Sequence, residues 1–159
     1  PDIILSSNSL VFKKKLLGIP RFGCINRHSS PLPAYGGILP VFRSIQHGER
    51  FVAVAVHRMV EGIDEGEVLS RKWLPVFPGD TMEFLYRKCF ILSFDATAEA
   101  IRMIRKSPNC PGVDNEGIEP SYFSFPKEKD WKEFRRNGGR FISIEKDWGG
   151  FGNNGGHFF

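Results

Sequence analysis

The middle of the chain most restricts the possible folds of this sequence. It contains a β-hairpin pattern that is followed directly by a strong helix-start signal. Phe51–Val60 alternates in the manner of a strand, and Glu67–Leu74 follows it after EGIDEG, a loop of hairpin length. In FPGDT, Asp80 is placed to cap a helix, Glu83 lies three residues on, and apolar periodicity continues to about residues 103–105. The segment therefore predicts an antiparallel hairpin followed by a long helix.

Shorter elements are expected before this segment. Ile3–Leu5 is typical of a strand, and Leu10–Leu17 of a short helix that Gly18 and Pro20 end. Gly23–Asn26 is brief and apolar enough for the middle of a mainly parallel sheet. A helix is expected at about 40–46. This order predicts an α/β fold with an open, mainly parallel sheet that contains an antiparallel hairpin.

The composition changes after Lys106, which divides the chain into a core of residues 1–106 and an extension of residues 107–159. The extension begins with a turn-rich linker and a short extended piece, YFSFP. A charged helix is expected over Lys127–Arg136, and the end is rich in glycine and asparagine. Its aromatic side chains are too many for a solvated tail, so we expect this piece to pack on the core and only residues from about Gly149 onward to be loose. The alternative is an aromatic platform for a sugar or a base. The aromatic residues are Tyr122, Phe123, Phe125, Trp131 and Phe134.

Charge and cysteine content narrow the class of protein. The net charge of +4 is confined to residues 1–27, where three consecutive lysines at 13–15, Arg21 and Arg27 face only Asp2. A local basic patch indicates a solvated helix start or an anionic ligand more than an RNA surface. No apolar run approaches the ~20 residues of a membrane span, and no secretory signal is present, so a cytoplasmic location is expected. Three separated cysteines suggest neither a disulfide framework nor a thiolate zinc site, and we expect them to be reduced and mostly buried.

Two polar side chains follow the second expected strand at spacing two. In an extended chain Asn26 and His28 point the same way, about 7 Å apart. An amide donor beside an imidazole suits a carbonyl oxygen that becomes negatively charged, and Asp64 in the hairpin loop could orient or charge the histidine. The alternative is structural: Asn26 caps a turn, and His28 bonds backbone groups in a proline-rich loop.

Several ordered motifs resemble one known family. CINRHSSPLPAYGGILPVFRSIQHGE, VAVHRM, GIDEGEVL and LPVFPGDT before a long helix are similar in order and spacing to the folate-dependent formyltransferases, across about residues 1–105. That family includes the glycinamide ribonucleotide, methionyl-tRNA and nucleotide-sugar enzymes. Its pattern Asn-x-His-x-Ser-x-Leu-Pro-x-Tyr-x-Gly is met by residues 26–37, and its later Asp-x-Gly falls on Asp64 and Gly66.

The resemblance implies a Rossmann-like sheet and transfer of a formyl group from 10-formyltetrahydrofolate to a primary amine, without a metal. It implies that Asn26 donates to the formyl oxygen and that protonated His28 stabilises its charge or passes a proton to the departing folate nitrogen. It also implies that Asp64 supports the histidine and, through water, helps to remove the amine proton.

The resemblance also assigns binding residues, with substrate contacts on the Asn-x-His motif. The expected folate pocket consists of Ser7, Asn8, Ser9, Leu10, Val11, Met59, Val60, Gly62 and Ile63, and the expected substrate contacts are Ser30, Pro33 and Tyr35. For any single folate residue the alternative is a plain connection between a strand and a helix.

The resemblance leaves the acceptor and the boundaries open. Gly36 stands where the tRNA and sugar enzymes often carry arginine, and the extension is too short for the C-terminal β-barrel of the tRNA enzymes. An amino sugar or another small amine is therefore expected. Alternatives are a methionyl-tRNA formyltransferase, a 10-formyltetrahydrofolate hydrolase, or a non-catalytic folate- or RNA-binding module. The family's first strands would precede Pro1, so we expect this chain to be a piece of a longer protein. On its own it should show no measurable formyl transfer, and it should self-associate through the exposed edge of its sheet.

Overall fold

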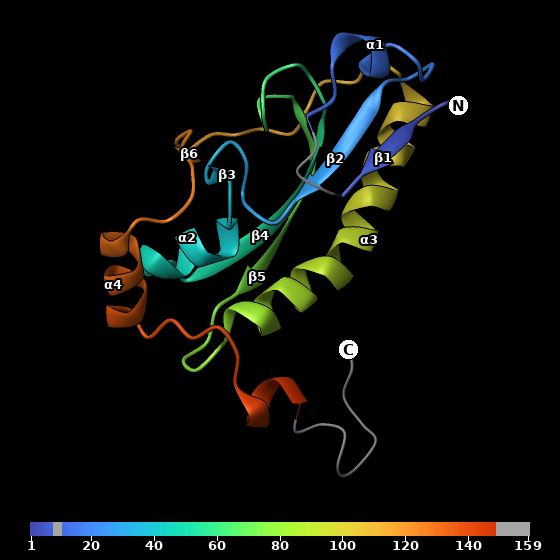
Figure 1. Cartoon of the computed structure of the whole chain (residues 1–159). Helices are drawn as coiled ribbons and strands as arrows, with labels where there is room; N and C mark the ends of the chain where they lie inside the picture. Colours follow the sequence, from blue (N-terminus) through green and yellow to red (C-terminus); the bar gives the residue numbers. More distant parts are fainter. Residues whose placement is uncertain (8–10, 149–159) are drawn as a thin grey trace, which may run out of the picture.

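The computed structural model describes residues 1–7 and 11–148 and has an α/β fold (Figure 1). Its main sheet has four strands in the order β1-β2-β4-β5. The β1–β2 pair is parallel, and the β2–β4 and β4–β5 pairs are antiparallel. The strands are β1 (Ile4–Ser6), β2 (Cys24–His28), β4 (Phe51–Arg58) and β5 (Val68–Pro75). The predicted hairpin is confirmed, and β2 lies inside the sheet as its apolar sequence predicts.

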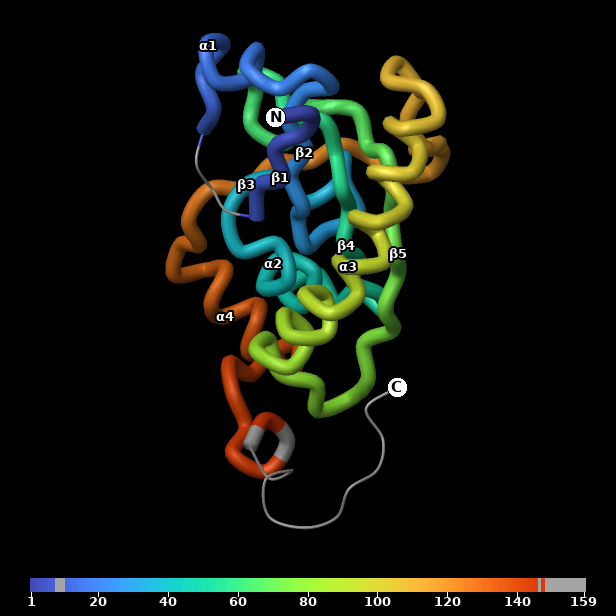
Figure 2. The backbone as a smooth tube through the Cα atoms, turned by 90° about the vertical axis from the view of Figure 1, so that its right-hand side faces the viewer, coloured from blue at the N-terminus to red at the C-terminus, as the bar shows by residue number. Residues whose placement is uncertain are grey.

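The long helix α3 (Met82–Lys106) packs along β4 and β5 (Figures 1 and 2). Its buried side chains recur every three to four residues, which places one stripe of the helix against the sheet. This stripe, Leu85, Cys89, Ser93, Ala96, Ala100 and Ile104, meets the fully buried Val52, Val54 and Val56 of β4 in the main core. The small alanine side chains allow a close approach of helix and sheet.

Helix α2 (Pro40–Gln46) is buried along its whole length and packs on α4 (Glu128–Arg136) of the extension. The Phe42 and Phe134 rings stack with their centroids 4.5 Å apart, and Phe134 is 1% exposed. The predicted packing of the extension on the core is therefore confirmed for this helix. Residues from Gly149 onward lie outside the described part.

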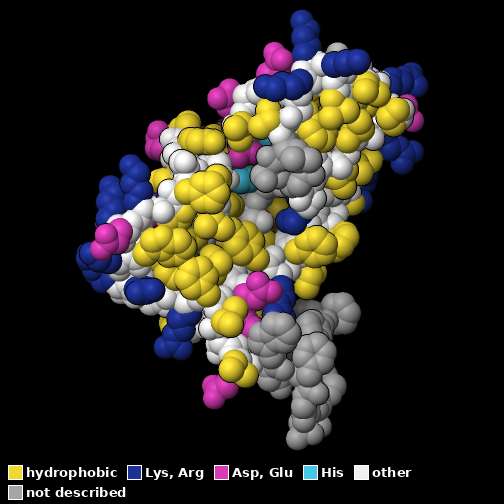
Figure 3. Space-filling view, in the orientation of Figure 1, with side chains coloured by type: hydrophobic (Ala, Val, Ile, Leu, Met, Phe, Trp, Pro, Cys, Tyr) yellow, Lys and Arg dark blue, Asp and Glu magenta, His cyan; other side chains and the backbone are white. Residues whose placement is uncertain are grey.

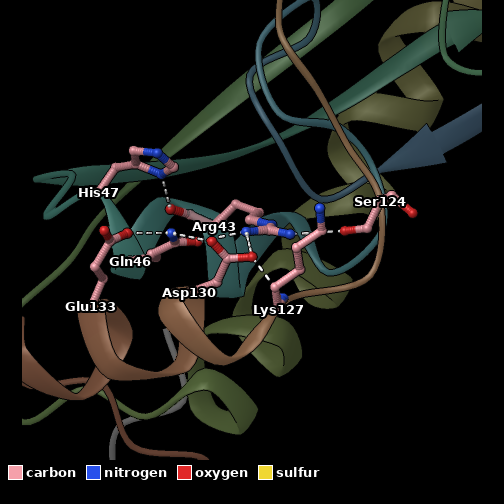
Figure 4. A network of polar contacts seen from close by, with 7 residues as sticks. All are labelled: Arg43, Gln46, His47, Ser124, Lys127, Asp130 and Glu133. Carbon is pink, nitrogen blue, oxygen red and sulfur yellow. Dashed lines mark hydrogen bonds and ion pairs between the residues drawn. The ribbon is translucent and has the colours of Figure 1, made fainter.

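A buried polar network also joins α2 to α4 (Figure 4). Arg43 Nη1 lies 3.0 Å from Asp130 Oδ2, and Arg43 Nη2 donates to the Ser124 carbonyl at 2.8 Å. The Gln46 amide donates to Asp130 and Glu133 at 3.2 and 2.7 Å. One arginine thus ties α2 both to α4 and to the strand segment before it.

That segment forms a second small sheet. The two-residue strands β3 (Gly36–Gly37) and β6 (Tyr122–Phe123) pair in parallel. A Cβ added at Gly37 would lie 2.2 Å from the Phe123 carbonyl oxygen, and Gly37 has φ +93°, so only glycine fits this approach. The pair brings residues 121–125 beside the loop that follows β2.

Two sequence predictions need correction. The helix expected over Leu10–Leu17 is only α1 (Lys14–Leu17), and none of its residues is buried. Its Leu10 end lies outside the described residues. A helix this short without a packed face gains little stability from its neighbours.

The start of α3 is also corrected, because Thr81 and not Asp80 is the cap. Thr81 has an extended backbone, and its Oγ1 accepts the Phe84 N–H at 3.0 Å. The Asp80 carboxylate instead accepts the Phe77 N–H at 2.8 Å and closes the preceding Pro78–Gly79 turn. Within residues 1–7 and 11–148, no helix has the length and apolar character needed to cross a membrane.

Candidate active site

The centre of the site is formed by facing residues of β2 and β4. Asn26 lies opposite His57 in the antiparallel register, so both side chains project from the same face of the sheet. Asn26 Nδ2 is 3.4 Å from His57 Nε2, and both residues are buried. His28 lies two residues beyond Asn26 on the same strand, as the spacing predicts.

Asp64 reaches these side chains from the loop between β4 and β5. Its Oδ2 is 3.7 Å from His28 Nδ1, and its Oδ1 is 3.5 Å from His57 Nε2. One carboxylate therefore lies between two imidazoles. The sequence prediction that Asn26, His28 and Asp64 converge agrees with these distances.

Gly66 allows the loop between β4 and β5 to pass close to the backbone of β4. A Cβ built on Gly66 would lie 1.7 Å from the Arg58 carbonyl oxygen, so the backbone passes where any other residue would clash. Asp64 itself has φ +57°, a left-handed conformation that aspartate tolerates better than most residues. The loop geometry thus places the carboxylate over the strands.

The hydrogen bonds of His28 indicate which ring atoms carry protons. Its Nε2 is 3.1 Å from the Tyr35 carbonyl oxygen, which can only accept, so Nε2 is the donor. Nδ1 faces the Asp64 carboxylate. His28 thus donates from Nε2 to the loop backbone and turns its other ring nitrogen toward the carboxylate.

His57 was not among the residues expected from the sequence. Burial lowers its pKa below the ordinary value, an effect that nearby His28 reinforces, while Asp64 and the Arg58 carbonyl oppose it. The alternation of β4 placed His57 on a definite face, but nothing in the sequence indicated that β4 pairs with β2 next to Asn26. That long-range pairing is what brings the second imidazole to the site.

These polar groups line a cavity of about 630 Å³. Figure 3 shows a histidine and an acidic side chain among hydrophobic side chains on this face. Of the expected folate residues, Ser7, Val11, Met59, Val60, Gly62 and Ile63 line the cavity, whereas Asn8, Ser9 and Leu10 lie outside the described residues. The remaining lining includes Phe12, Arg27, Ile38, Leu39, Tyr86, Tyr122 and Phe125. The lining thus combines the amide, imidazoles and carboxylate with mainly apolar and aromatic side chains.

The three expected substrate contacts do not line this cavity. Ser30 is fully buried, and its hydroxyl has no hydrogen-bond partner within the described chain. The Pro33 carbonyl accepts the Ser121 N–H at 3.1 Å. Tyr35 donates its hydroxyl to Glu49 at 2.5 Å and stacks on Phe123 beside a separate hollow of about 490 Å³. These residues shape the loop after β2 rather than the cavity wall.

Two aromatic side chains that do reach the cavity come from the extension. Tyr122 and Phe125 line it with 57% and 71% of their surfaces exposed. Both belong to the segment that β3 and Arg43 hold in place. Across residues 1–7 and 11–148, no three His, Cys, Asp or Glu side chains are grouped as a metal site would require.

The chain is similar to proteins of one family. Residues 1–101 match the family model described as Formyl transferase. A methionyl-tRNA formyltransferase of Wigglesworthia glossinidia brevipalpis is 35% identical over 102 residues, which cover 64% of this chain and 32% of that protein. The chain spans about a third of the length of the first curated relatives it matches.

Solved structures of the same kind share the fold. Glycinamide ribonucleotide transformylase 1 from Symbiobacterium toebii aligns with a TM-score of 0.62 and 27% identity, over 66% of this chain and 50% of that one. An N-formyltransferase from Helicobacter canadensis, in complex with folinic acid and dTDP-3-aminofucose, aligns with a TM-score of 0.53 and 29% identity, over 67% of this chain and 38% of that one. Since the family model covers most of the chain, including Asn26, His28 and Asp64, this protein belongs to the formyl transferase family.

Proposed function

We propose that this chain carries the catalytic centre of a cytoplasmic enzyme that moves the formyl group of 10-formyltetrahydrofolate to a primary amine. The observation that carries the proposal is the convergence of Asn26, His28 and Asp64 on one cavity whose lining is otherwise mainly apolar and aromatic. An amide donor, an imidazole and a carboxylate are the groups that acyl transfer to an amine needs.

The proposed chemistry forms one bond and breaks another. The amine nitrogen attacks the formyl carbon, and the carbonyl electron pair moves to oxygen. When that pair returns, the bond from the formyl carbon to the folate nitrogen breaks, and the proton lost by the amine ends on that nitrogen. Formyl transfer therefore consumes no oxidant, reductant or metal.

Each side chain has a distinct part in this proposal. Asn26 donates an N–H to the formyl oxygen as it becomes negative, and the charge of His28 stabilises the same oxygen. Asp64 lies 3.7 Å from His28 Nδ1 and is placed to orient that ring. Asp64 also accepts, through a water molecule, the proton that the amine releases.

The donor would bind against the apolar lining of the cavity. Met59, Val60 and Ile63 supply flexible and branched apolar surface to it, and Val60 and Ile63 are about half exposed. Ser7 adds a hydroxyl that already accepts from Arg27 Nε at 2.6 Å. These residues fit a flat heterocycle with a polar rim.

We propose a small amine, such as an amino sugar, as the acceptor. The exposed rings of Tyr122 and Phe125 give the mouth of the cavity an aromatic wall on which a sugar or base could stack. The Helicobacter canadensis relative is described in complex with folinic acid and dTDP-3-aminofucose. The second candidate acceptor is methionyl-tRNA, since the curated relatives carry that name.

Donor binding and product analysis test the function. We expect saturable binding of folinic acid to the 159-residue chain, weakened by Ile63→Asp and unaffected by Asp95→Asn, an exposed position of α3 that does not line the cavity. Turnover is assayed with 10-formyltetrahydrofolate and a panel of amino sugars and methionyl-tRNA, using this chain and any longer polypeptide that contains it. Free formate formed equally without an amine would indicate a hydrolase. Absence of folinic acid binding, or no transfer by the longer polypeptide, would overturn the proposal.

A further inference from the structure

The Nε2 atom of His57 lies near two possible hydrogen-bond partners, the Asn26 amide and the Asp64 carboxylate, and it can bond only one of them at a time. Its Nδ1 is 2.9 Å from the Arg58 carbonyl oxygen and must donate there. Its Nε2 is 3.4 Å from the Asn26 amide nitrogen and 3.5 Å from Asp64 Oδ1. The amide nitrogen can only donate, and the carboxylate can only accept.

The proton on Nε2 therefore decides the partner. In the neutral ring, Nε2 has a lone pair and accepts an Asn26 N–H. In the protonated ring, Nε2–H donates to Asp64 and opposes the amide N–H. Leaving a buried polar group without its partner is unfavourable, so each protonation state of His57 favours a different partner.

We propose that His57 is a positioning residue whose neutral form fixes the orientation of the Asn26 amide and whose protonation turns the Nε2–H toward Asp64 and releases that amide. The contact itself stands on the geometry, whereas its effect on turnover rests on the proposed function. With one Asn26 N–H held by His57, the second N–H remains for the formyl oxygen.

The other atom of the amide supports a two-state arrangement. Asn26 Oδ1 is buried and has no hydrogen-bond partner within the described chain. The released amide can flip, which would place that oxygen beside the protonated Nε2–H, where Asn26 Oδ1 and Asp64 Oδ1 would share the one hydrogen. One proton on His57 thus selects between two amide orientations, and the flipped one withdraws the proposed oxyanion donor.

The surroundings of His57 keep the ring neutral near pH 7. Its charged and titratable neighbours are Asp64 from the hairpin loop and His28 from β2, while Arg27 of β2 and Tyr86 of α3 line the same cavity. Burial is the largest influence and lowers the pKa of His57, so the releasing proton is taken up only on the acid side of its ordinary value of 6.5. Near pH 7, therefore, neutral His57 accepts the Asn26 N–H and holds the amide in place.

Nuclear magnetic resonance tests the contact on the 159-residue chain without any turnover. We expect the side-chain amide signals of Asn26 to shift with pH in step with the His57 ring signals. In His57→Gln, the glutamine oxygen can still accept from Asn26 but cannot be protonated, so the shift should vanish. The matched control is His47→Gln, because His47 lies outside the cavity and bonds the Arg43 carbonyl. The proposal would be overturned if the Asn26 amide signals did not change as His57 titrates. It would also be overturned if they showed the same pH dependence in His57→Gln as in wild type.

Steady-state kinetics give the second readout. They are measured on a form of the protein that transfers the formyl group, called here the turnover-competent form. His57→Ala should lower kcat at least about 10-fold with little change in the KM for the donor. His57→Gln should restore part of that loss at neutral pH and should not show the acid-side decline. Thermal unfolding identifies any variant that fails to fold. A normal NMR linkage without transfer by any form would contradict the proposed function and leave the His57 contact standing. Equal acid-side decline in wild type and His57→Gln would contradict the positioning role.

Discussion

Gly37 donates its backbone N–H to Asp64 Oδ2 over 2.8 Å, which links β3 to the hairpin loop. This bond fixes the carboxylate between His28 and His57 without using either imidazole. An asparagine at position 64 could still accept the Gly37 N–H, because its side chain has a carbonyl oxygen. Substitution there can therefore remove the charge while retaining the loop.

We expect Asp64→Asn and His28→Ala each to lower kcat by at least ~100-fold in a turnover-competent form, because each removes charge handling needed mainly in the transition state. Circular dichroism and thermal unfolding should show that both variants remain folded. The control is Asp95→Asn on the exposed side of α3. Near-normal turnover of either variant would show that the proposed roles are wrong.

Gly66 should tolerate no side chain. Gly66→Ala places a methyl group 1.7 Å from the Arg58 carbonyl oxygen, so the hairpin loop must shift and carry Asp64 with it. We expect a loss of stability of about 1–3 kcal/mol in urea unfolding, together with weaker binding of folinic acid. Glu65→Ala, an exposed change in the same loop, is the comparison. Equal stability of the two variants would mean that the close approach is absent.

How far the sequence predicts the fold depends on the range of each interaction. The hairpin, α2 and the body of α3 follow from local alternation, periodicity and capping, and they are found within a few residues of the expected bounds. The convergence of Asn26, His28 and Asp64 was expected from motif resemblance. His57 was missed because its role depends on pairing with β2, about 30 residues away in sequence. The sequence shows that Tyr122 and Phe125 are aromatic, but it does not predict their position at the cavity. Strands of only two residues, such as β3 and β6, have no periodicity that could indicate it.

The buried pair between α2 and α4 should make the docking of the extension sensitive to acid. The pKa of Asp130 is held below its ordinary value of 3.8, chiefly by the Lys127 N–H and then by Arg43, and despite some opposing desolvation. A depressed carboxyl pKa stabilises the fold above 3.8, and this contribution is lost as the pH falls through the lower folded value. Asp130→Asn should therefore be less stable than wild type at pH 7 and should show a flatter loss of unfolding temperature below about pH 4. Parallel acid profiles would contradict this assignment.

Removing the arginine should cost more than removing the pair. Arg43→Ala leaves the Asp130 carboxylate buried without its main cation, which typically costs about 3–5 kcal/mol. Arg43→Met combined with Asp130→Leu should restore part of that loss, because apolar side chains of similar size need no partner. Urea unfolding of the single and double variants measures the coupling. Additive losses would show that the two side chains do not interact.

Tyr122 and Phe125 should affect the acceptor and leave the donor alone. Their rings are 57% and 71% exposed at the mouth of the cavity, so truncation to alanine removes little buried surface. We expect Tyr122→Ala and Phe125→Ala to raise the KM for an amino-sugar acceptor by about 5- to 10-fold, as the loss of one stacking contact of about 1 kcal/mol implies. Unfolding temperature and folinic acid affinity should stay close to wild type, and Phe77→Ala, exposed in the turn before α3, serves as the control. An unchanged acceptor KM in both variants would assign the two rings to the surface of the extension, whereas a parallel loss of folinic acid affinity would place them against the donor.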